Sequence, residues 1–545
     1  MMRRIFNFPG GVQLREHKRE STTMGVAQAS MPEHIILPLQ QHIGIAARPV
    51  VDVGDRVLKG QVIAEAASEI SVPVHASTSG TVETIEERPI PHPSGLPAPA
   101  VVIKTDGRDE AITGYGQQRD YRVMTPQALR DAIKDSGIVG LGGAGFPSYL
   151  KLKNDQHKVN TLILNGVECE PYITCDQMLM QDHADSIVRG LQIMQRALDI
   201  KQAIIAIENN KPKEYDQIVE ALYYADAGNI EVVQVPTVYP AGGEKQLIQM
   251  LLNKEVPTHG LPMDIGVVCH NVGTAYAVAC AIEHNEPLIS RYVTVTGSVA
   301  KGRVLEVLIG TPVSHLIEEC GGNRKTLSRV IMGGPMMGFA LHDDEVPVVK
   351  TTNCILVNST ISDVPLPSRR ETALPCIRCG ACSEACPAGL LPQQLYWYAR
   401  AKDFDKAQDY NLFDCIECGC CDYVCPSQIP LVQYYRYAKT AIWQQEREKI
   451  MADVSRQRHE FHKFRIERDK KEREARHKKK RQSIDGTSAK DDKKAAIEAA
   501  MERVRKKREQ SRIEPKNTEN LTEQQQKLIE EAENRREKRF NDTNP

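Results

Sequence analysis

A cysteine pattern that occurs twice constrains this chain more than any other feature of its sequence. Two segments, CIRCGACSEACP and CIECGCCDYVCP, both fit CxxCxxCxxxCP. Three closely spaced thiolates in this pattern can hold three irons of a cubane, while the fourth reaches the other cluster. The sequence therefore predicts two [4Fe-4S] clusters whose ligand sets cross over between the two runs. The first set is Cys376, Cys379, Cys382 and Cys425, and the second is Cys415, Cys418, Cys421 and Cys386.

Zinc and structural disulfides are the alternative interpretations of these cysteines. Zinc sites use four ligands in two separated pairs, whereas the eight cysteines fall in two runs of four. Disulfides fit less well still, because the N-terminus has no apolar signal region and a cysteine-rich chain without one is expected in a reducing compartment. Cys420 adds a fifth thiol to the second run, and we expect it to be a non-ligand beside Cys421.

Length and charge limit what else the chain can be. Its 545 residues exceed the roughly 250–300 at which a single core stops growing, so several domains are expected. Seventy basic and 71 acidic residues give a net charge of −1, which favours neither nucleic-acid nor membrane binding. No run of about eighteen apolar residues occurs, so we expect no transmembrane span, although the chain could dock on a membrane.

The N-terminal part is expected to contain a small all-β domain. Residues 1–30 form a polar arm to which we assign no chemistry, and 31–110 contain short β-branched runs separated by turn signals. The segments VDVGDRVLKGQVIAE and VHASTSGTVETI resemble the two halves of the barrel-sandwich hybrid of lipoyl and biotinyl carriers. The hairpin between them, ASEISVPVHA, has no lysine to carry a cofactor. The resemblance therefore implies a docking or packing domain and not a swinging arm.

Residues 120–284 are typical of a Rossmann-like α/β domain. Helix-period segments alternate with the strand runs TLILNG, AIIAIE and VVQVP. A helix should begin after Thr125 and end near Ser136, because Pro126 is favoured in the first turn. The next loop has glycine at 140, 142, 143 and 145 and opens onto a helix. Such a loop lets backbone N–H groups approach a phosphate or a flavin, although it can also merely turn a corner.

Four segments, in the right order, resemble motifs of the flavin- and NADH-binding subunit of respiratory complex I. They are GLGGAGFPSYLK at 140–151, NGVECEP at 165–171, YPAGGEK at 239–245 and CHNVGT at 269–274. The resemblance implies that Gly140, Gly142, Gly143 and Gly145 lie under the isoalloxazine and phosphate of FMN. It also implies that Phe146 stacks near the nicotinamide and that Lys151 reaches a phosphate. Asn165 and Asn271 would bond the flavin, and Glu168, Glu170 and Glu244 would line the flavin and NADH site.

Some residues depart from the motifs of that protein. Leu141, Val167 and Lys245 stand where it has Arg, Asp and Glu, and His270 replaces an Asn. Each change removes or alters a polar contact to FMN or NADH. For His270 we expect a satisfied core or turn histidine, and Glu168 with Glu170 could instead form a solvated loop pair.

The C-terminal half is predicted to contain three further parts. Residues 285–345 follow the strand, strand, helix, strand order of the β-grasp (soluble-ligand-binding) module and precede a linker over 346–370. A two-cluster ferredoxin module is expected over 371–435, and a charged helical or disordered tail over 436–545. The tail's basic clusters could touch anionic lipid, with a solvated tail as the alternative. Interleaved Glu and scarce aromatics argue against nucleic-acid binding.

This arrangement resembles the RnfC family of the bacterial Rnf (Rsx) ion-translocating electron-transport complex over about residues 5–440. The resemblance implies an oxidoreductase subunit, peripheral on the cytoplasmic face of the inner membrane, bound to other membrane subunits and with soluble ferredoxin as a further candidate partner. It implies FMN, two [4Fe-4S] clusters and NADH as substrate, because a flavin connects a two-electron donor to one-electron acceptors. The alternatives are a soluble NADH diaphorase subunit of a hydrogenase or formate dehydrogenase, and a cluster-bearing adaptor with a decayed flavin site.

Overall fold

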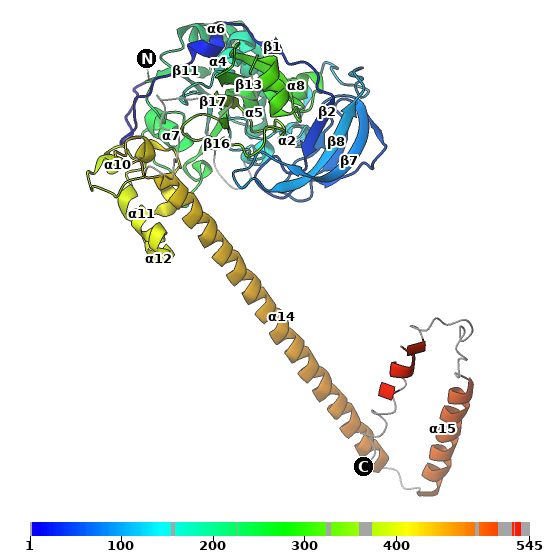
Figure 1. Ribbon diagram of the computed structural model, residues 1–545. Coiled ribbons are helices and arrows are strands. Elements are labelled where there is room, and N and C mark those ends of the chain that lie inside the picture. The colour runs from blue at the N-terminus through cyan, green and yellow to red at the C-terminus, as the bar shows by residue number, and fades with distance from the viewer. Residues whose placement is uncertain are drawn as a thin grey trace. The chain divides into compact units, whose positions relative to one another are not determined.

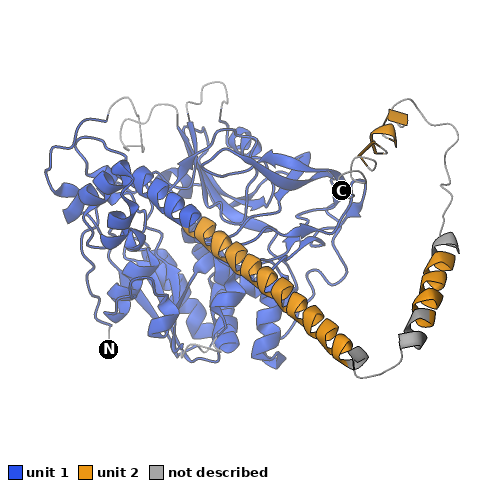
Figure 2. Cartoon of the chain, turned by 90° about the horizontal axis from the view of Figure 1, so that it is seen from below, with its two compact units in different colours: residues 1–445 blue, residues 446–545 orange. Residues whose placement is uncertain are grey.

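The computed structural model describes residues 3–153, 159–225, 227–322, 329–358, 373–485 and 490–510, and part of 526–535. The chain divides into two units, Met1–Gln445 and Glu446–Pro545 (Figure 2). Within the described ranges, no helix combines the length and apolar character needed to cross a lipid bilayer.

The N-terminal arm contacts three later parts of the first unit. It contains α1 (Arg19–Thr22) and β1 (Ala27–Gln28), and β1 pairs in parallel with β14 (Arg303–Leu308). The backbone N–H of Gly11 donates to the carbonyl of Ala385 in the cluster module, and Val12 forms a bridge with Tyr239. A Cβ at Gly10, whose φ is +63°, would lie 2.7 Å from the backbone of Ala385. Only glycine fits this approach, so the arm is built for contact with the cluster module.

The predicted all-β domain consists of two small antiparallel sheets, in which β2, β8 and β7 lie side by side (Figure 1). Alternating residues such as Ile35 and Leu37 are fully buried, as expected for half-buried strands. The hairpin that would carry the cofactor in a carrier domain packs on its neighbour, because the Tyr149 hydroxyl donates to the carbonyl of Glu69. The sheet orders are β2-β8-β7-β4 and β3-β5-β6, with β2 (His34–Pro38), β3 (Arg48–Pro49), β4 (Arg56–Val57), β5 (Val62–Glu65), β6 (Val74–His75), β7 (Gly80–Pro89) and β8 (Pro97–Thr105).

The α/β domain is built on a parallel sheet with strand order β11-β10-β9-β12. Its helix α2 begins as predicted, since the Thr125 side chain accepts a hydrogen bond from the N–H of Ala128. In chain order the elements are η1 (Tyr121–Val123), α2 (Pro126–Asp135), α3 (Ser148–Lys151), β9 (Thr161–Gly166), α4 (Cys175–Asp182), α5 (Ala184–Leu198), β10 (Gln202–Glu208), α6 (Pro212–Tyr224), β11 (Ile230–Val235), α7 (Glu244–Leu252), η2 (Pro262–Ile265), β12 (Val267–Asn271) and α8 (Val272–His284).

Successive strand residues of this sheet contribute to different cores. Leu162 and Leu164 of β9 pack in a core with residues of α5 and α8, whereas Ile163 packs in a second core with residues of α7. Helices therefore cover both faces, which explains why the strand sequences are almost continuously apolar. The order places β9 and β12 next to each other although two strands intervene in sequence. The strand order reverses here, because β10 and β11 lie on one side of β9 and β12 on the other. Crevices at such switch points bind ligands in open α/β sheets.

The next domain contains a six-stranded mixed sheet with the order β1-β14-β13-β17-β15-β16. The predicted linker over 346–370 is wrong for its first part, because Cys354–Asn358 form β17 between β13 and β15. This run is fully buried and pairs with strands far away in sequence, which its short apolar pattern alone did not reveal. Residues 359–370 of the predicted linker lie outside the described residues. The remaining elements are β13 (Ser290–Gly297), α9 (Val313–Glu319), β15 (Arg329–Met332) and β16 (Phe339–Ala340).

The cluster module is a set of short helices around the two cysteine runs. The first turns of the long helix α14 belong to this module, where the Tyr435 hydroxyl donates to the Pro392 carbonyl at 2.6 Å. Beyond it, the described residues of the second unit are charged and helical, with pairs such as Arg468–Glu472. The helices are α10 (Ala381–Glu384), α11 (Pro392–Ala401), α12 (Phe404–Asp409), η4 (Leu412–Asp414), α13 (Cys420–Tyr423), α14 (Leu431–Asp485) and α15 (Lys490–Gln510).

A buried lysine joins the all-β and α/β domains. Lys350 is 1% exposed, and its Nζ donates to the carbonyls of Pro73 at 2.9 Å and Gly137 at 2.7 Å. Burial lowers the pKa of Lys350 from its ordinary 10.5 to about 7. Burial, together with Lys350, also lowers the pKa of His75 to about 3, so this neighbour stays neutral above pH 7.

Lys350 should make the stability of the first unit depend on pH. The unfolded chain keeps this proton up to its ordinary pKa of 10.5, but the folded chain only up to about 7, so the unfolded state binds more protons in between. The free energy of unfolding must then rise with pH across this window. We expect wild type to gain ~2 kcal/mol between pH 7 and pH 9 relative to Lys350→Met. Calorimetry of both proteins, with the exposed Lys104→Met as control, checks this, and parallel pH profiles would contradict it.

Candidate functional site

The glycine-rich loop presents an open turn in front of the α/β domain. It is closed by backbone hydrogen bonds from Gly140 N–H to Phe146 O at 2.8 Å and from Gly145 N–H to Gly140 O at 3.1 Å. Gly142, Gly143 and Ala144 are exposed, and a Cβ at Gly143 would meet nothing within 4 Å. Phe146 is half-buried. The loop therefore leaves space for a flat group against its backbone.

The loop lies against the switch point of the parallel sheet. A Cβ at Gly142 would lie 3.2 Å from the Cβ of Asn271, which ends β12 and caps α8 by accepting a hydrogen bond from Gly273 N–H. Asn271 is the register partner of Asn165, near the end of β9. Asn165 in turn donates to the carbonyl of Gly242 at 2.8 Å. These four segments, predicted from sequence to share one site, do meet in the structure.

Lys151 and Glu244 form the charged part of this site. Lys151 Nζ lies 2.8 Å from Glu244 Oε1 and 3.2 Å from the carbonyl of Cys269. Burial opposes the charge on Lys151, but the Glu244 carboxylate and the Cys269 thiol outweigh it and raise the pKa of Lys151. Both side chains of the pair remain about one third exposed, at 30% and 38%. A charged ammonium is thus available to a phosphate at the rim of the loop.

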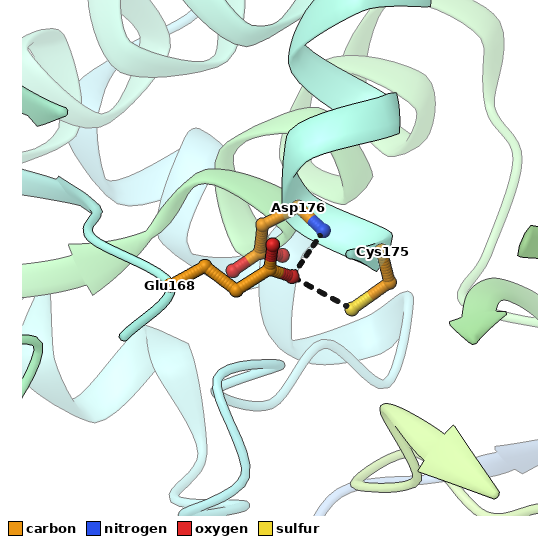
Figure 3. Close-up of side chains that lie close together, drawn as sticks. All are labelled: Glu168, Cys175 and Asp176. Atoms are coloured by element: carbon orange, nitrogen blue, oxygen red, sulfur yellow. Dashed lines mark hydrogen bonds between the residues drawn. The ribbon is translucent and has the colours of Figure 1, made fainter. Parts of the chain in front are cut away.

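Glu168 belongs to a buried group with Cys175 and Asp176 (Figure 3). Glu168 Oε1 accepts from the backbone N–H of Asp176 at 2.8 Å and from the Cys175 thiol at 3.5 Å. The ammonium of Lys18 lies 3.7 Å from Glu168 Oε2, and burial raises the pKa of Glu168 to about 7. With two donors and a lysine already at this carboxyl group, the arrangement does not favour a metal ion. Asp176 accepts from the Asn271 amide at 2.6 Å, so the group positions the side chain of Asn271 beside the glycine loop.

Glu170 lies elsewhere than predicted. Its Oε1 accepts from the backbone N–H groups of Met336 at 2.7 Å and Met337 at 3.1 Å, in a turn of the β-grasp domain. A Cβ at Gly334 in the same turn would clash with the Glu170 side chain. Burial raises the pKa of Glu170 to about 7. The carboxyl group is therefore bound to the β-grasp turn and does not line the loop.

The departures from the complex I motifs now have structural explanations. Leu141 is buried, and its backbone carbonyl accepts from the guanidinium of Arg291 at 3.3 Å. The loop therefore lacks the arginine of the complex I motif but is contacted by Arg291 of β13. Val167 packs in the core beside α7. Lys245 lies 3.4 Å from Asp414 in the cluster module. His270 is 4% exposed, and burial lowers its pKa to about 3, so it is a core histidine as expected. It is not the satisfied one that the sequence predicts, because its Nε2 has no hydrogen-bond partner among the described residues.

Four contributors to this site were missed by sequence reasoning. Lys18 donates to the carbonyls of Glu168 and Ile173 from an arm to which no chemistry was assigned. Thr274 accepts from the N–H of Leu141 through its hydroxyl at 3.0 Å, and Asp176 and Arg291 act as described above. Thr274 is the last residue of the CHNVGT segment, so its part in the site could have been predicted from the sequence. The other three have no local signal, because their contacts join segments far apart in sequence.

The eight cysteines of the repeated pattern surround two cavities. The first cavity is lined by Cys376, Cys379, Cys382 and Cys425. The second is lined by Cys386, Cys415, Cys418 and Cys421. Four thiols around each space fit a cubane, and the grouping is the crossed one expected from the sequence. Cys420 is fully buried and lines neither cavity.

The second cavity is the one that adjoins the α/β domain. The Tyr239 hydroxyl donates to the carbonyl of Cys418 at 2.6 Å, and both groups are buried. Lys245 pairs with Asp414, which directly precedes Cys415, and the amide of Gln246 donates to Pro387 at 3.4 Å. In the first cavity, Cys379 is exposed to solvent. One thiol set thus adjoins the α/β domain, and the other includes a solvent-exposed thiol.

Four segments of the chain match known protein families. Residues 6–108 match the RnfC barrel sandwich hybrid domain, and 133–280 match the Nuo51 FMN-binding domain. Residues 292–340 match the SLBB domain, and 375–429 match the 4Fe-4S dicluster domain. The predicted multidomain fold class is thereby confirmed. The domains predicted to hold FMN and two [4Fe-4S] clusters are both present.

Two similar proteins bear the name of the C subunit of the ion-translocating oxidoreductase complex. The one from Vibrio cholerae is 46% identical over 524 residues, which cover 94% of this chain and 65% of the relative. The one from Pectobacterium atrosepticum is 44% identical over 509 residues, covering 92% of this chain and 71% of the relative. A solved structure of an NAD⁺-reducing [NiFe]-hydrogenase is 21% identical, covers 53% of this chain and 55% of that one, and has a TM-score of 0.42. At that score the likeness supports no inference about the site.

Proposed function

Because the chain belongs to the family of the C subunit of ion-translocating oxidoreductase complexes, we propose that it passes electrons between NAD(H) and two [4Fe-4S] clusters through FMN. It would do so as a peripheral subunit on the cytoplasmic face of the inner membrane, bound to the membrane subunits of the complex. Ferredoxin is a further candidate partner. The observation that carries the proposal is the direct contact between the flavin-type domain and one of the two cysteine cavities.

The proposed FMN site consists of the loop and the switch point. The backbone of Gly140, Gly142, Gly143 and Gly145 would take the flat ring and the phosphate, as a glycine turn can. Asn165 and Asn271 stand at adjacent strand ends, where an open α/β sheet binds its ligand. Lys151 would hold the phosphate, while Phe146 and Glu244 would border the flavin and the nicotinamide. The buried Glu168 would instead act through Asp176, which accepts from Asn271. FMN supplies the exchange between hydride and single-electron chemistry when bound.

The positions of the two cysteine sets suggest the order in which the two clusters carry electrons. The set Cys386, Cys415, Cys418 and Cys421 adjoins Tyr239 and Lys245, so we propose that its cluster exchanges electrons with the flavin. The set that includes exposed Cys379 would then pass them to the partner protein. Electrons would travel from NADH to the flavin, to the inner cluster and to the outer cluster, or in the opposite direction.

Anaerobic purification followed by FMN and NADH titration tests this function. We expect one FMN per chain to bind, seen as quenching of its fluorescence, and NADH to bleach the cluster absorbance. Absence of flavin binding together with absence of bleaching would exclude the diaphorase function and leave a cluster-bearing adaptor. Co-sedimentation with membranes that contain the other subunits tests the location, and a freely soluble chain would contradict it.

The proposed order of the clusters predicts different behaviour for two serine variants. Cys379→Ser should lose the outer cluster, retain FMN and still show NADH-dependent bleaching of the inner cluster. Cys418→Ser should lose the inner cluster, and its outer cluster should be reduced by dithionite but not by NADH. Electron paramagnetic resonance after each reductant measures this directly. Rapid reduction of the outer cluster by NADH in Cys418→Ser would show that the order is wrong.

A further inference from the structure

A cavity distinct from the two cysteine cavities lies between three domains of the first unit and borders the glycine loop. Its volume is about 380 Å³, within the range of small-molecule sites. Its walls come from the end of the all-β domain, from α4 and α8 of the α/β domain, and from β13 and β14 of the β-grasp domain. Leu141 and Gly273 close one end. Gly142, Gly143, Asn165, Lys151 and Glu244 of the proposed FMN site do not line this cavity.

Three tyrosine rings line this cavity. Tyr276 and Tyr292 are arranged edge to face with ring centroids 6.2 Å apart, and the third ring is that of Tyr115. The hydroxyl of Tyr292 is hydrogen-bonded to His183 at 2.7 Å, which fixes the ring. Aromatic faces carry a negative electrostatic potential and attract cations, more strongly when water is excluded.

The two cations of the cavity lining already have partners. Lys59 is paired with Asp109 at 2.7 Å, and Arg291 donates to the carbonyl of Leu141 at 3.3 Å. Lys59 Nζ also lies 5.4 Å from the ring centroid of Tyr115, so its ammonium sits between a carboxylate and an aromatic face. The cavity wall thus shows how an ammonium group can be held.

Three carboxyl groups of the lining have no such cation in the described part of the chain. One is Asp176, which accepts from the Asn271 amide, and the other two are those of Glu286 and Glu306. Glu286 and Glu306 form no ion pair with any residue in the described part of the chain, and Glu306 accepts only from the hydroxyl of Ser290, at 3.1 Å. Burial raises the pKa of Glu286 against the weaker opposing influence of His284 and Lys59, and Glu306 adds to the rise. The Lys59 ammonium lies between a carboxylate and an aromatic ring. Glu286, Glu306 and the tyrosine rings offer the same two kinds of group, but no lysine or arginine of the chain is paired with these two carboxyl groups in the described residues.

We propose that this cavity is a second ligand site, which takes a small organic cation between the carboxylates of Glu286 and Glu306 and the rings of Tyr115, Tyr276 and Tyr292. The ligand class is an amine or a quaternary ammonium compound. An inorganic cation would use the carboxylates but gain little from three rings. An anion or a neutral molecule would leave both carboxylates uncompensated in a half-buried site.

Isothermal titration calorimetry of the full chain with its cofactors tests the site. Putrescine and choline are the cationic probes, and the comparators are sodium chloride, inorganic phosphate and the neutral isostere of choline in which carbon replaces nitrogen. We expect heat of binding from at least one organic cation and none from the comparators. No heat from either cation at millimolar concentration, or equal binding of the neutral isostere, would overturn the proposal.

Two variants locate the binding. The double variant Glu286→Gln/Glu306→Gln should weaken cation binding roughly tenfold or more, because it removes both charge-assisted contacts. The control Glu83→Gln/Glu87→Gln makes the same charge change on exposed positions of β7 and should bind normally. Tyr115→Leu keeps every charge and should weaken binding several-fold, so the proposal is tested even if the double variant does not fold. Unchanged binding in both cavity variants would place the cation elsewhere and contradict the proposal.

Discussion

Cys425→Ser is expected to remove the outer cluster, although Cys425 lies in the second cysteine run. The cavity that it lines is shared with Cys376, Cys379 and Cys382, all from the first run. A cubane that loses one of its four thiolate ligands should no longer be held by the protein. Because one of two equal clusters is then missing, the iron content should fall to about half. Electron paramagnetic resonance of the reduced protein should show only the signal of the inner cluster, and FMN content should not change.

Matched variants make the crossed ligand sets testable. Cys425→Ser and Cys379→Ser should give the same spectrum, and Cys386→Ser should match Cys418→Ser instead. Cys420→Ser is the control, because this thiol lines neither cavity and should leave both clusters in place. If Cys425→Ser resembled Cys418→Ser, each run would hold its own cluster, and the crossed assignment would be wrong.

Gly142→Val is expected to remove FMN while leaving both clusters. A Cβ at this position would lie 3.2 Å from Asn271, so a valine must displace the strand end or project into the proposed flavin space. Overpacking costs about 1–3 kcal/mol, which corresponds to a roughly tenfold to hundredfold loss of affinity. Fluorescence titration with FMN measures this, and the iron content provides the internal comparison.

The control is the same substitution at Gly228, where an added Cβ would meet nothing within 4 Å. Gly228→Val should bind FMN as wild type does and keep both clusters. Equal loss of FMN in both variants would reflect general instability. Retention of FMN in Gly142→Val would show that the flavin does not lie against this loop.

Features with a local chemical signal could be predicted from the sequence. The thiols that line the two cavities lie within short runs whose spacing is set by cubane geometry, so the grouping followed from the pattern alone. The start of α2 followed from Thr125 and Pro126, because capping depends on neighbours in the chain. The glycine loop could be recognised because it needs a bare backbone over a short stretch.

Features that depend on distant contacts could not be predicted. Lys245 was interpreted as a lost flavin contact, but it lies within ion-pair distance of Asp414, 169 positions away in sequence. Glu170 matched a flavin motif, but its carboxyl group binds the turn at Met336. The strand β17 looked like a linker because four apolar residues fit a buried strand and an extended connection equally well. In each case the deciding partner lies far away in sequence, in another domain for Lys245 and Glu170 and in other strands of the same sheet for β17.

NADH reduction of the clusters with and without flavin tests the proposed electron route most directly. The chain is purified anaerobically, stripped of FMN and mixed with NADH while cluster absorbance is followed. We expect no bleaching by NADH in the stripped protein, full bleaching by dithionite, and recovery of the NADH reaction when FMN is added back. Bleaching by NADH without flavin, or none after flavin is restored, would contradict a route from NADH through FMN to the clusters.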